Sequence, residues 1–276
     1  MKPISRILLA LDTGGMLTDV WREALFLAET FAAKLVLVHA IPEAGEWSPE
    51  FGTLAGRVLD LFGDLAREAE DRGVEVLRPF EVHAGTPAEL VLEKARERQA
   101  SLVMLGAASK GVLDRLLLGS TAETVLRKAP TPVWVVRPGR AHDRLRRVLC
   151  AVDASEPGRE SLAAAIPLAR TYVAPLSILH VVPRSGPTHA VDCREVPDLT
   201  EPFDLHGIEV ETLCYEGSVP EAVVAAANDV DPDLLVIGEA GRTGLARLLR
   251  RNTAEEVVRK LPCSLLAVKA EGSSAA

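Results

Sequence analysis

The sequence predicts an α/β protein with two tandem doubly wound domains, each a five-stranded parallel sheet flanked by helices. First, ILLALD at 7–12 returns as VLCAVD at 148–153, and KLVLVHAIP at 34–42 returns as PLSILHVVP at 175–183. Second, short apolar runs alternate with longer segments whose apolar residues follow helical spacing. Third, the repeat is far longer than a solenoid repeat, so each copy is expected to be a whole domain.

The repeat sets the domain boundaries that we expect, 1–138 and 144–270. A segment rich in Arg, Pro and Gly separates them and is typical of a linker. The spacing between the copies falls from 141 residues at the first strands to 132 at SLVMLG (101–106) and DLLVIG (233–238). The second copy is therefore expected to be shorter in its middle.

The strands of the first domain are predicted from apolar runs that suit a parallel sheet buried on both faces. These runs are 5–11, 34–40, 74–82, 101–106 and 132–137. Helices are predicted between them, including a long second helix from Pro49 to Arg72. The apolar positions expected to face the sheet are Val20, Ala24, Leu27, Phe31, Leu54, Val58, Leu61, Leu65, Ala69, Leu90, Val91 and Ala95.

The second domain is predicted to lack most of its second helix. The segment 183–207 fills the equivalent place and contains four prolines, which interrupt helices because they lack an amide hydrogen. We expect a mostly irregular crossover, with at best a short helical turn near 198–206.

Composition excludes several classes of protein. The chain has 276 residues, 48% hydrophobic and 25% charged, as in ordinary globular proteins. The net charge is −8 and both halves are acidic, which argues against a nucleic-acid partner; the basic run Arg137 to Arg147 is expected to be a solvated linker. The N-terminal apolar run is too short for a signal peptide or a membrane span. We therefore expect a soluble cytoplasmic protein with no membrane partner.

The cysteines and histidines indicate no metal site. The four cysteines lack a short paired spacing, so reduced and mostly buried thiols are expected. The cluster His189, Asp192, Cys193 and His206 does not have the spacing of a zinc site. His39 and His180 stand at matching strand ends, where hydrogen bonds to the backbone are expected rather than ligand binding.

Three features of the first domain meet where a doubly wound sheet binds ligands, beyond the carboxyl ends of its strands. Asp12 follows the first strand, Gly106 follows the fourth, and Gly119-Ser120 opens the helix that carries TAETVLRK. A helix N-terminus exposes unpaired amide donors, so it favours an anion such as phosphate. The alternative is that Ser120 or Thr121 is only a helix cap and Gly106 only a turn.

The motifs resemble those of the universal stress protein family. Gly106-x-x-Ser109, nine residues and then Gly119-Ser120 is similar to that family's nucleotide loop, G-x-x-G-x9-G-[S/T]. LRKAPTPVWVV in the first copy also fits the family. VDASE (152–156), GEAGRTG (238–244) and NTAEEVVRKLPCSLLAV fit it in the second. The resemblance spans nearly the whole chain, apart from 183–207 and the tail.

The resemblance implies a stress-response protein that binds ATP or a related adenine nucleotide. Adenine would lie near the first two strand ends, and the phosphates along the fourth strand's loop and the helix after it. The expected binding residues are Leu11, Asp12, Ala40, Gly106, Ser109, Gly119, Ser120 and Thr121, with Asp153, Gly238 and Gly241 in the second domain.

Each copy departs from the family's loop. The first has Ser109 in place of the second glycine, where a Cβ costs about 1–2 kcal/mol if a left-handed conformation is required. The second has Arg251-Asn252 in place of Gly-Ser, and a long side chain there would occlude a triphosphate. We therefore expect the first domain to be the nucleotide-binding one and the second to be degenerate.

No enzyme is predicted, because the chain lacks the Walker motif G-x-x-x-x-G-K-[S/T] and nominates no strong general base. Slow ATP hydrolysis is left open. The alternative function is a nucleotide-free interaction scaffold in stress signalling. The family pairs through its last strand, so the apolar runs 132–137 and 263–269 are expected to form an internal pseudo-dimer, and a further homodimer is a second prediction.

Overall fold

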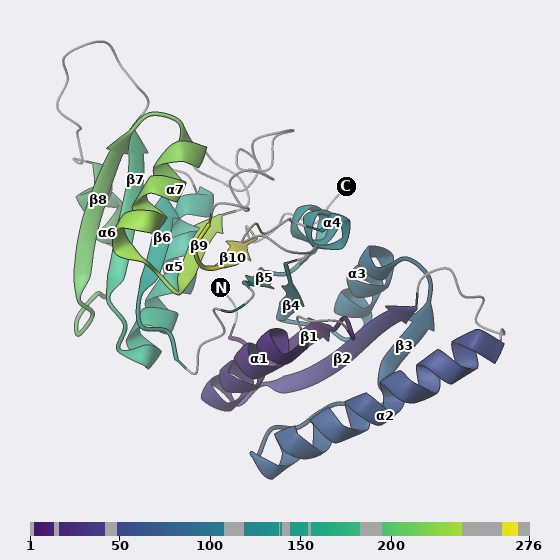
Figure 1. Cartoon of the computed structure of the whole chain (residues 1–276). Coiled ribbons are helices and arrows are strands. Elements are labelled where there is room, and N and C mark those ends of the chain that lie inside the picture. The colour runs from purple at the N-terminus through teal and green to yellow at the C-terminus, as the bar shows by residue number, and fades with distance from the viewer. Residues whose placement is uncertain are drawn as a thin grey trace. The chain divides into compact units, whose positions relative to one another are not determined.

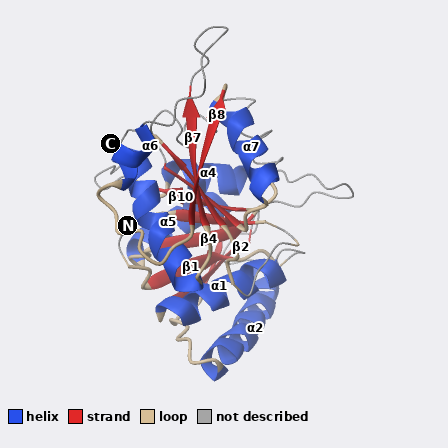
Figure 2. Cartoon of the chain, turned by 90° about the vertical axis from the view of Figure 1, so that its left-hand side faces the viewer, coloured by secondary structure: helices blue, strands red, loops and turns tan. Residues whose placement is uncertain are grey.

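The computed structural model describes residues 3–13, 17–41, 49–107, 119–137, 139, 144–153, 156–182, 195–238 and 261–269. It divides into two compact units, called here the first and the second domain (Figure 1). In both, parallel strands lie between helices (Figure 2). The predicted fold class is confirmed.

The sheet of the first domain has the strand order β3-β2-β1-β4-β5, and every neighbouring pair is parallel. Its strands are β1 (Arg6–Ala10), β2 (Lys34–Ile41), β3 (Glu81–Ala84), β4 (Leu102–Gly106) and β5 (Val133–Val136). The inner strands are buried on both faces, as their continuous apolar sequences predict.

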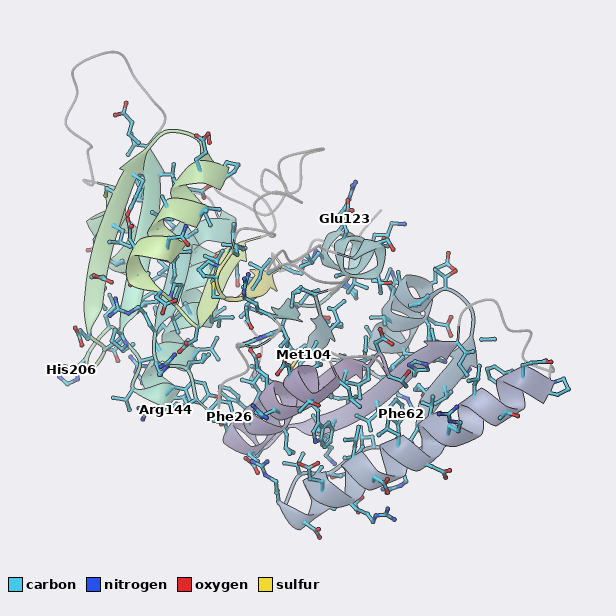
Figure 3. The ribbon with its side chains drawn as sticks, viewed as in Figure 1. Phe26, Phe62, Met104, Glu123, Arg144 and His206 are labelled. Atoms are coloured by element: carbon cyan, nitrogen blue, oxygen red, sulfur yellow. The ribbon has the colours of Figure 1, made fainter. Side chains whose placement is uncertain are left out.

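Helices cover both faces of this sheet. They are α1 (Leu17–Phe31), α2 (Pro49–Asp71), α3 (Pro87–Glu97) and α4 (Ser120–Lys128). On one face α1 lies beside α2, where the Trp21 indole donates to Glu68 at 2.9 Å; α3 and α4 lie together on the other face. Phe62 of α2 and Met104 of β4 project into the core, and both are fully buried (Figure 3).

Two details of the first domain differ from the sequence prediction. The third strand is predicted at 74–82 but spans 81–84, and Val76 makes an isolated bridge to Leu35. Pro79 lies between Val76 and the start of β3, and a proline has no amide hydrogen to donate to a neighbouring strand. On α2 the predicted Val58, Leu65 and Ala69 are buried and Phe62 is buried beside them, whereas Leu54, expected to be inward, is 43% exposed.

The second domain repeats the strand order, as β10-β9-β6-β7-β8. Its elements are β6 (Val148–Val152), α5 (Glu156–Tyr172), β7 (Leu176–Val182), α6 (Glu195–Thr200), β8 (Val210–Glu216), α7 (Val219–Val230), β9 (Leu234–Gly238) and β10 (Ser264–Val268). The six-residue α6 stands where the first domain has the long α2. The predicted loss of that helix is confirmed, but the short helix begins before 198 because Pro197 is tolerated in a first turn.

The turn after the third strand is the same in both domains. Gly85 has φ +128° and its amide donates to the Ile41 carbonyl at 3.2 Å; Gly217 has φ +135° and donates to Val182 at 3.1 Å. Side chains rarely adopt such φ values, so both turns require glycine. The equivalence confirms the repeat that the sequence shows.

Among the described cysteines, the prediction of a reduced thiol is wrong for Cys214. Cys150 and Cys263 are free and buried, and burial raises the pKa of the Cys150 thiol. Cys214 is disulfide-bonded and lies half-buried on the edge strand β8. Cys193 lies outside the described residues.

Candidate functional site

The candidate site lies at the carboxyl ends of β2, β1 and β4, which are neighbours in the sheet. The chain leaves β1 toward β2 on one side and enters β4 on the other, so the strand order reverses between β1 and β4. Doubly wound sheets bind ligands at such a reversal. The fold therefore brings the predicted residues Leu11, Asp12, Ala40 and Gly106 to one edge.

The ladder between β1 and β2 stops one residue short of this edge. Its last pair is Ala10 with Val38, and the Leu11 amide then donates to the Val38 carbonyl at 3.0 Å. In a parallel ladder the next bond would run from the Ala40 amide to the Leu11 carbonyl. That bond is not formed; the His39 side chain lies 2.7 Å from the Leu11 carbonyl instead, through Nδ1.

The histidine contact fixes the local chemistry. A carbonyl only accepts hydrogen bonds, so the proton is on Nδ1 of His39 and Nδ1 donates. The sequence expectation of a backbone-bonded histidine at this position is confirmed. Within the described part of the chain, the Ala40 amide has no hydrogen-bond acceptor. It is an open donor at the edge of the sheet.

Exposure at this strand end suits a ligand. Leu11 is buried, Ala40 is half-buried and Asp12 is exposed. An amide donor and a carboxylate acceptor therefore stand one strand apart at the rim of the sheet.

The N-terminus of α4 supplies further donors. Gly119 is the N-cap, with φ −64° and ψ 152°, and no side chain caps the helix. Ser120 and Thr121, considered above as caps, instead lie inside the first turn, and Ser120 is exposed. The Glu123 amide donates to the Gly119 carbonyl at 3.0 Å, and the Glu123 side chain points away from the helix (Figure 3). The three earlier amides of a first helical turn have no partner within the helix, so they are donors that a ligand could use.

The conformation of Gly119 does not require glycine, because its dihedral angles are extended and open to any residue. A glycine here adds no side-chain atoms of its own beside the first-turn amides. Gly106 is half-buried and ends β4 opposite Val136. Ser109, in the segment between Gly106 and Gly119, lies outside the described residues.

The second domain differs at the same position. Its ladder runs one pair further, to Val152 with His180, the equivalents of Leu11 and His39. Asp153, the equivalent of Asp12, is only 2% exposed, and Val181, the equivalent of Ala40, is buried. This strand end is closed where that of the first domain is open.

Helix α5 contributes to the closure. A Cβ on Gly158 would lie 2.2 Å from the Asp153 carbonyl oxygen and 2.9 Å from its carboxylate, so the helix packs directly on this aspartate. Gly238 ends β9, paired with Val268, and is buried. Gly241, Arg251 and Asn252 lie outside the described residues, so the predicted loss at Arg251 stays a prediction.

Neither a metal site nor a membrane segment is found in the parts of the chain that the structure describes. No group of three or more His, Cys, Asp or Glu side chains there could hold a metal ion. None of the described helices is long and apolar enough to cross a membrane. Of the four clustered residues whose spacing the sequence analysis weighed against a zinc site, His206 is exposed and the other three lie outside the described residues.

Comparison with known proteins identifies the family. The model of the universal stress protein family matches residues 3–137 and again 144–269. A universal stress protein E homolog of Haemophilus influenzae is 28% identical over 205 residues, 66% of either chain, and a universal stress protein of Mycobacterium tuberculosis is 24% identical over 238 residues, 80% of either chain. The crystal structure of an Archaeoglobus fulgidus universal stress protein has the same fold, with a TM-score of 0.75 at 19% identity over 98% of this chain and 99% of that one. The chain belongs to the universal stress protein family and carries two of its domains in tandem.

Proposed function

We propose that the first domain binds ATP or a related adenine nucleotide at the carboxyl edge of its sheet, and that the second domain does not. The observation that carries this proposal is the open end of β1 and β2, where the Ala40 amide lacks an acceptor within the described residues. A stress-response role for the nucleotide-bound protein follows from the family.

The first domain offers a hydrogen-bonding group for each part of an adenine nucleotide. The Ala40 amide would donate to a ring nitrogen of adenine. The exposed Asp12 carboxylate would accept from the ribose hydroxyls. The phosphates would lie at the first turn of α4, where unpaired amides and the helix dipole favour negative charge.

The second domain lacks two of these groups in usable form. Asp153 is buried under α5, and the equivalent strand end is closed by ladder bonds. One nucleotide per chain is therefore expected.

Several further predictions accompany this function. Asp12 is the only carboxylate placed in the described site and no Walker motif accompanies it, so we propose a binding protein rather than an enzyme, with slow ATP hydrolysis left open. A cytoplasmic location, the internal pseudo-dimer and a homodimer also stay predictions.

Calorimetric titration of the full chain with ATP tests the proposal. We expect saturable binding near one nucleotide per chain, and its loss in Gly119→Arg, which places in the first domain the residue type found at Arg251 in the second. Gly56→Arg is the matched control: Gly56 is exposed on α2 and a Cβ added there would meet no atom within 4 Å, so this variant should bind normally. Absence of binding by the unmodified chain would favour the scaffold function instead.

A further inference from the structure

Two donors are directed at the Leu11 carbonyl. The backbone ladder directs the Ala40 amide at it, and the His39 imidazole reaches it from the neighbouring strand. At 2.7 Å the imidazole makes the bond, and the ladder ends at the preceding pair. The side chain therefore takes the place of a backbone hydrogen bond.

Within the described residues, the Ala40 amide has no backbone acceptor. A ladder bond from Ala40 to Leu11 would consume the donor and would draw the two strand ends together. Without it, the amide remains on the β1 side of β2, where the exposed Asp12 follows Leu11. An unpaired amide at a half-buried position is costly to leave without an acceptor, so it favours a ligand that supplies one.

The second domain shows the closed alternative in the same chain. There the pair Val152 with His180 belongs to the ladder, although the strand sequences match those of the first domain. Both arrangements are therefore compatible with this sheet.

We infer that His39 is a positioning residue: its Nδ1–H holds the Leu11 carbonyl and thereby keeps the Ala40 amide available to a ligand. The inference about the strand end depends on the geometry alone. Its consequence for ATP affinity rests on the function proposed above.

Hydrogen exchange of the nucleotide-free full chain, followed by NMR at the Ala40 amide, tests the first part. In His39→Leu the Leu11 carbonyl is released and the ladder can close, so exchange at Ala40 should slow by about tenfold. In His39→Asn the side-chain amide can replace Nδ1–H, so exchange should stay as fast as in the unmodified chain. Unchanged exchange in His39→Leu would overturn the inference.

The matched control is His180→Asn, which alters the equivalent histidine of the closed strand end and should leave exchange at Ala40 unchanged. A slowed Ala40 amide in this control would show a global effect and would count against a local role of His39.

ATP titration of the same variants tests the second part. We expect His39→Leu to bind at least about tenfold more weakly and His39→Asn to bind within about threefold of the unmodified chain, since one hydrogen-bond donor is at stake. The two parts can fail separately. If exchange at the Ala40 amide slows in His39→Leu but neither the unmodified chain nor any variant binds ATP, the strand-end inference stands and the proposed function fails. Equal ATP affinity in all binding-competent variants would overturn the positioning role.

Discussion

The two domains agree in their framework and differ at one strand end. Both have the same strand order, and both turn after the third strand on a glycine with φ near +130° (+128° and +135°). At the end of the first strand they part: Asp12 is exposed beside an incomplete ladder, whereas Asp153 is buried beside a complete one.

The opposite edge of the sheet shows how a framework feature survives a change of residue. In the first domain the Ser101 hydroxyl accepts from the Ser5 and Arg6 amides at 2.9 and 3.0 Å. In the second the carboxylate of Asp233, the equivalent of Ser101, accepts from the Arg146 amide at 2.5 Å. Amides that begin a buried strand need an acceptor, so the role is kept although the residue is not.

The proposed binding edge differs between the domains, and an unmade hydrogen bond there would benefit only a domain that binds a ligand. Closing a ladder by one bond is itself stabilising, by about 1 kcal/mol. A copy released from ligand binding is therefore expected to drift toward the closed form. The difference between the domains agrees with the proposal that the first domain binds a nucleotide and the second does not.

The largest effect expected from this division is a selective stabilisation by ATP. At about 100 times its dissociation constant, a ligand stabilises the state that binds it by about 2.7 kcal/mol. The three tryptophans, at 21, 47 and 134, all belong to the first copy, so their fluorescence follows that domain. Chemical unfolding should show ATP raising the tryptophan transition and leaving the tyrosine-bearing second domain unchanged. An equal gain in both domains would contradict the asymmetry.

A smaller effect, the same in both domains, is expected at the turn glycines. Gly85→Ala and Gly217→Ala each force a side chain into a φ that glycine adopts freely, at a cost of about 2 kcal/mol. The first variant should lower the tryptophan transition and the second should not. Gly63→Ala is the control: Gly63 is half-buried on α2, but a Cβ added there would meet no atom within 4 Å, so this variant should not destabilise. A large difference between the free energies that the two substitutions cost would contradict the equivalence of the two turns.

Much of this framework follows from the sequence because it depends on local patterns. Buried parallel strands carry continuous apolar runs, and Gly85-Thr-Pro returns in the second copy as Gly217-Ser-Val-Pro. The prolines of 183–207 likewise exclude a long helix. The third strand is mispredicted because Val74 and Val76 are apolar and buried without belonging to the strand.

The binding edge is less predictable, since it depends on contacts across strands. The sequence nominates Leu11, Asp12 and Ala40 through the family resemblance, and the structure brings them together. The sequence cannot show that His39 bonds to Leu11 while His180 belongs to a closed ladder, because the two histidines stand in nearly the same local sequence. The disulfide at Cys214 is also missed, because the sequence has no short paired cysteine spacing that would predict it.

Replacing the equivalent aspartates separates binding from stability. Asp153→Ala removes a buried carboxylate and should destabilise the second domain by about 1.5 kcal/mol without changing ATP affinity. Asp12→Ala alters an exposed side chain, so it should change stability by less than about 0.5 kcal/mol but weaken ATP binding. Unfolding curves and titrations of both variants check this. A strong loss of ATP affinity in Asp153→Ala would mean that the second domain also binds.

The smallest expected effect concerns an ion cluster that the second domain lacks. Glu81 is buried on β3, where it binds Arg98 and His83 and lies 3.7 Å from Lys94. The positions equivalent to Glu81, Lys94 and Arg98 in the second copy are Leu213, Ala226 and Val230. Acid should therefore weaken the first domain selectively.

The sign follows from the pKa of Glu81. Burial alone would raise it, but the hydrogen bonds from His83 and Arg98 and the charges of Arg98 and Lys94 outweigh burial and lower the pKa below its usual 4.5. The carboxylate thus contributes stability above pH 4.5, and this contribution is lost as the pH falls through the lowered value. Glu81→Gln should cost the first domain about 1 kcal/mol at neutral pH and progressively less in acid, as measured by tryptophan fluorescence. A cost that is independent of pH would assign Glu81 a packing role in place of an electrostatic one.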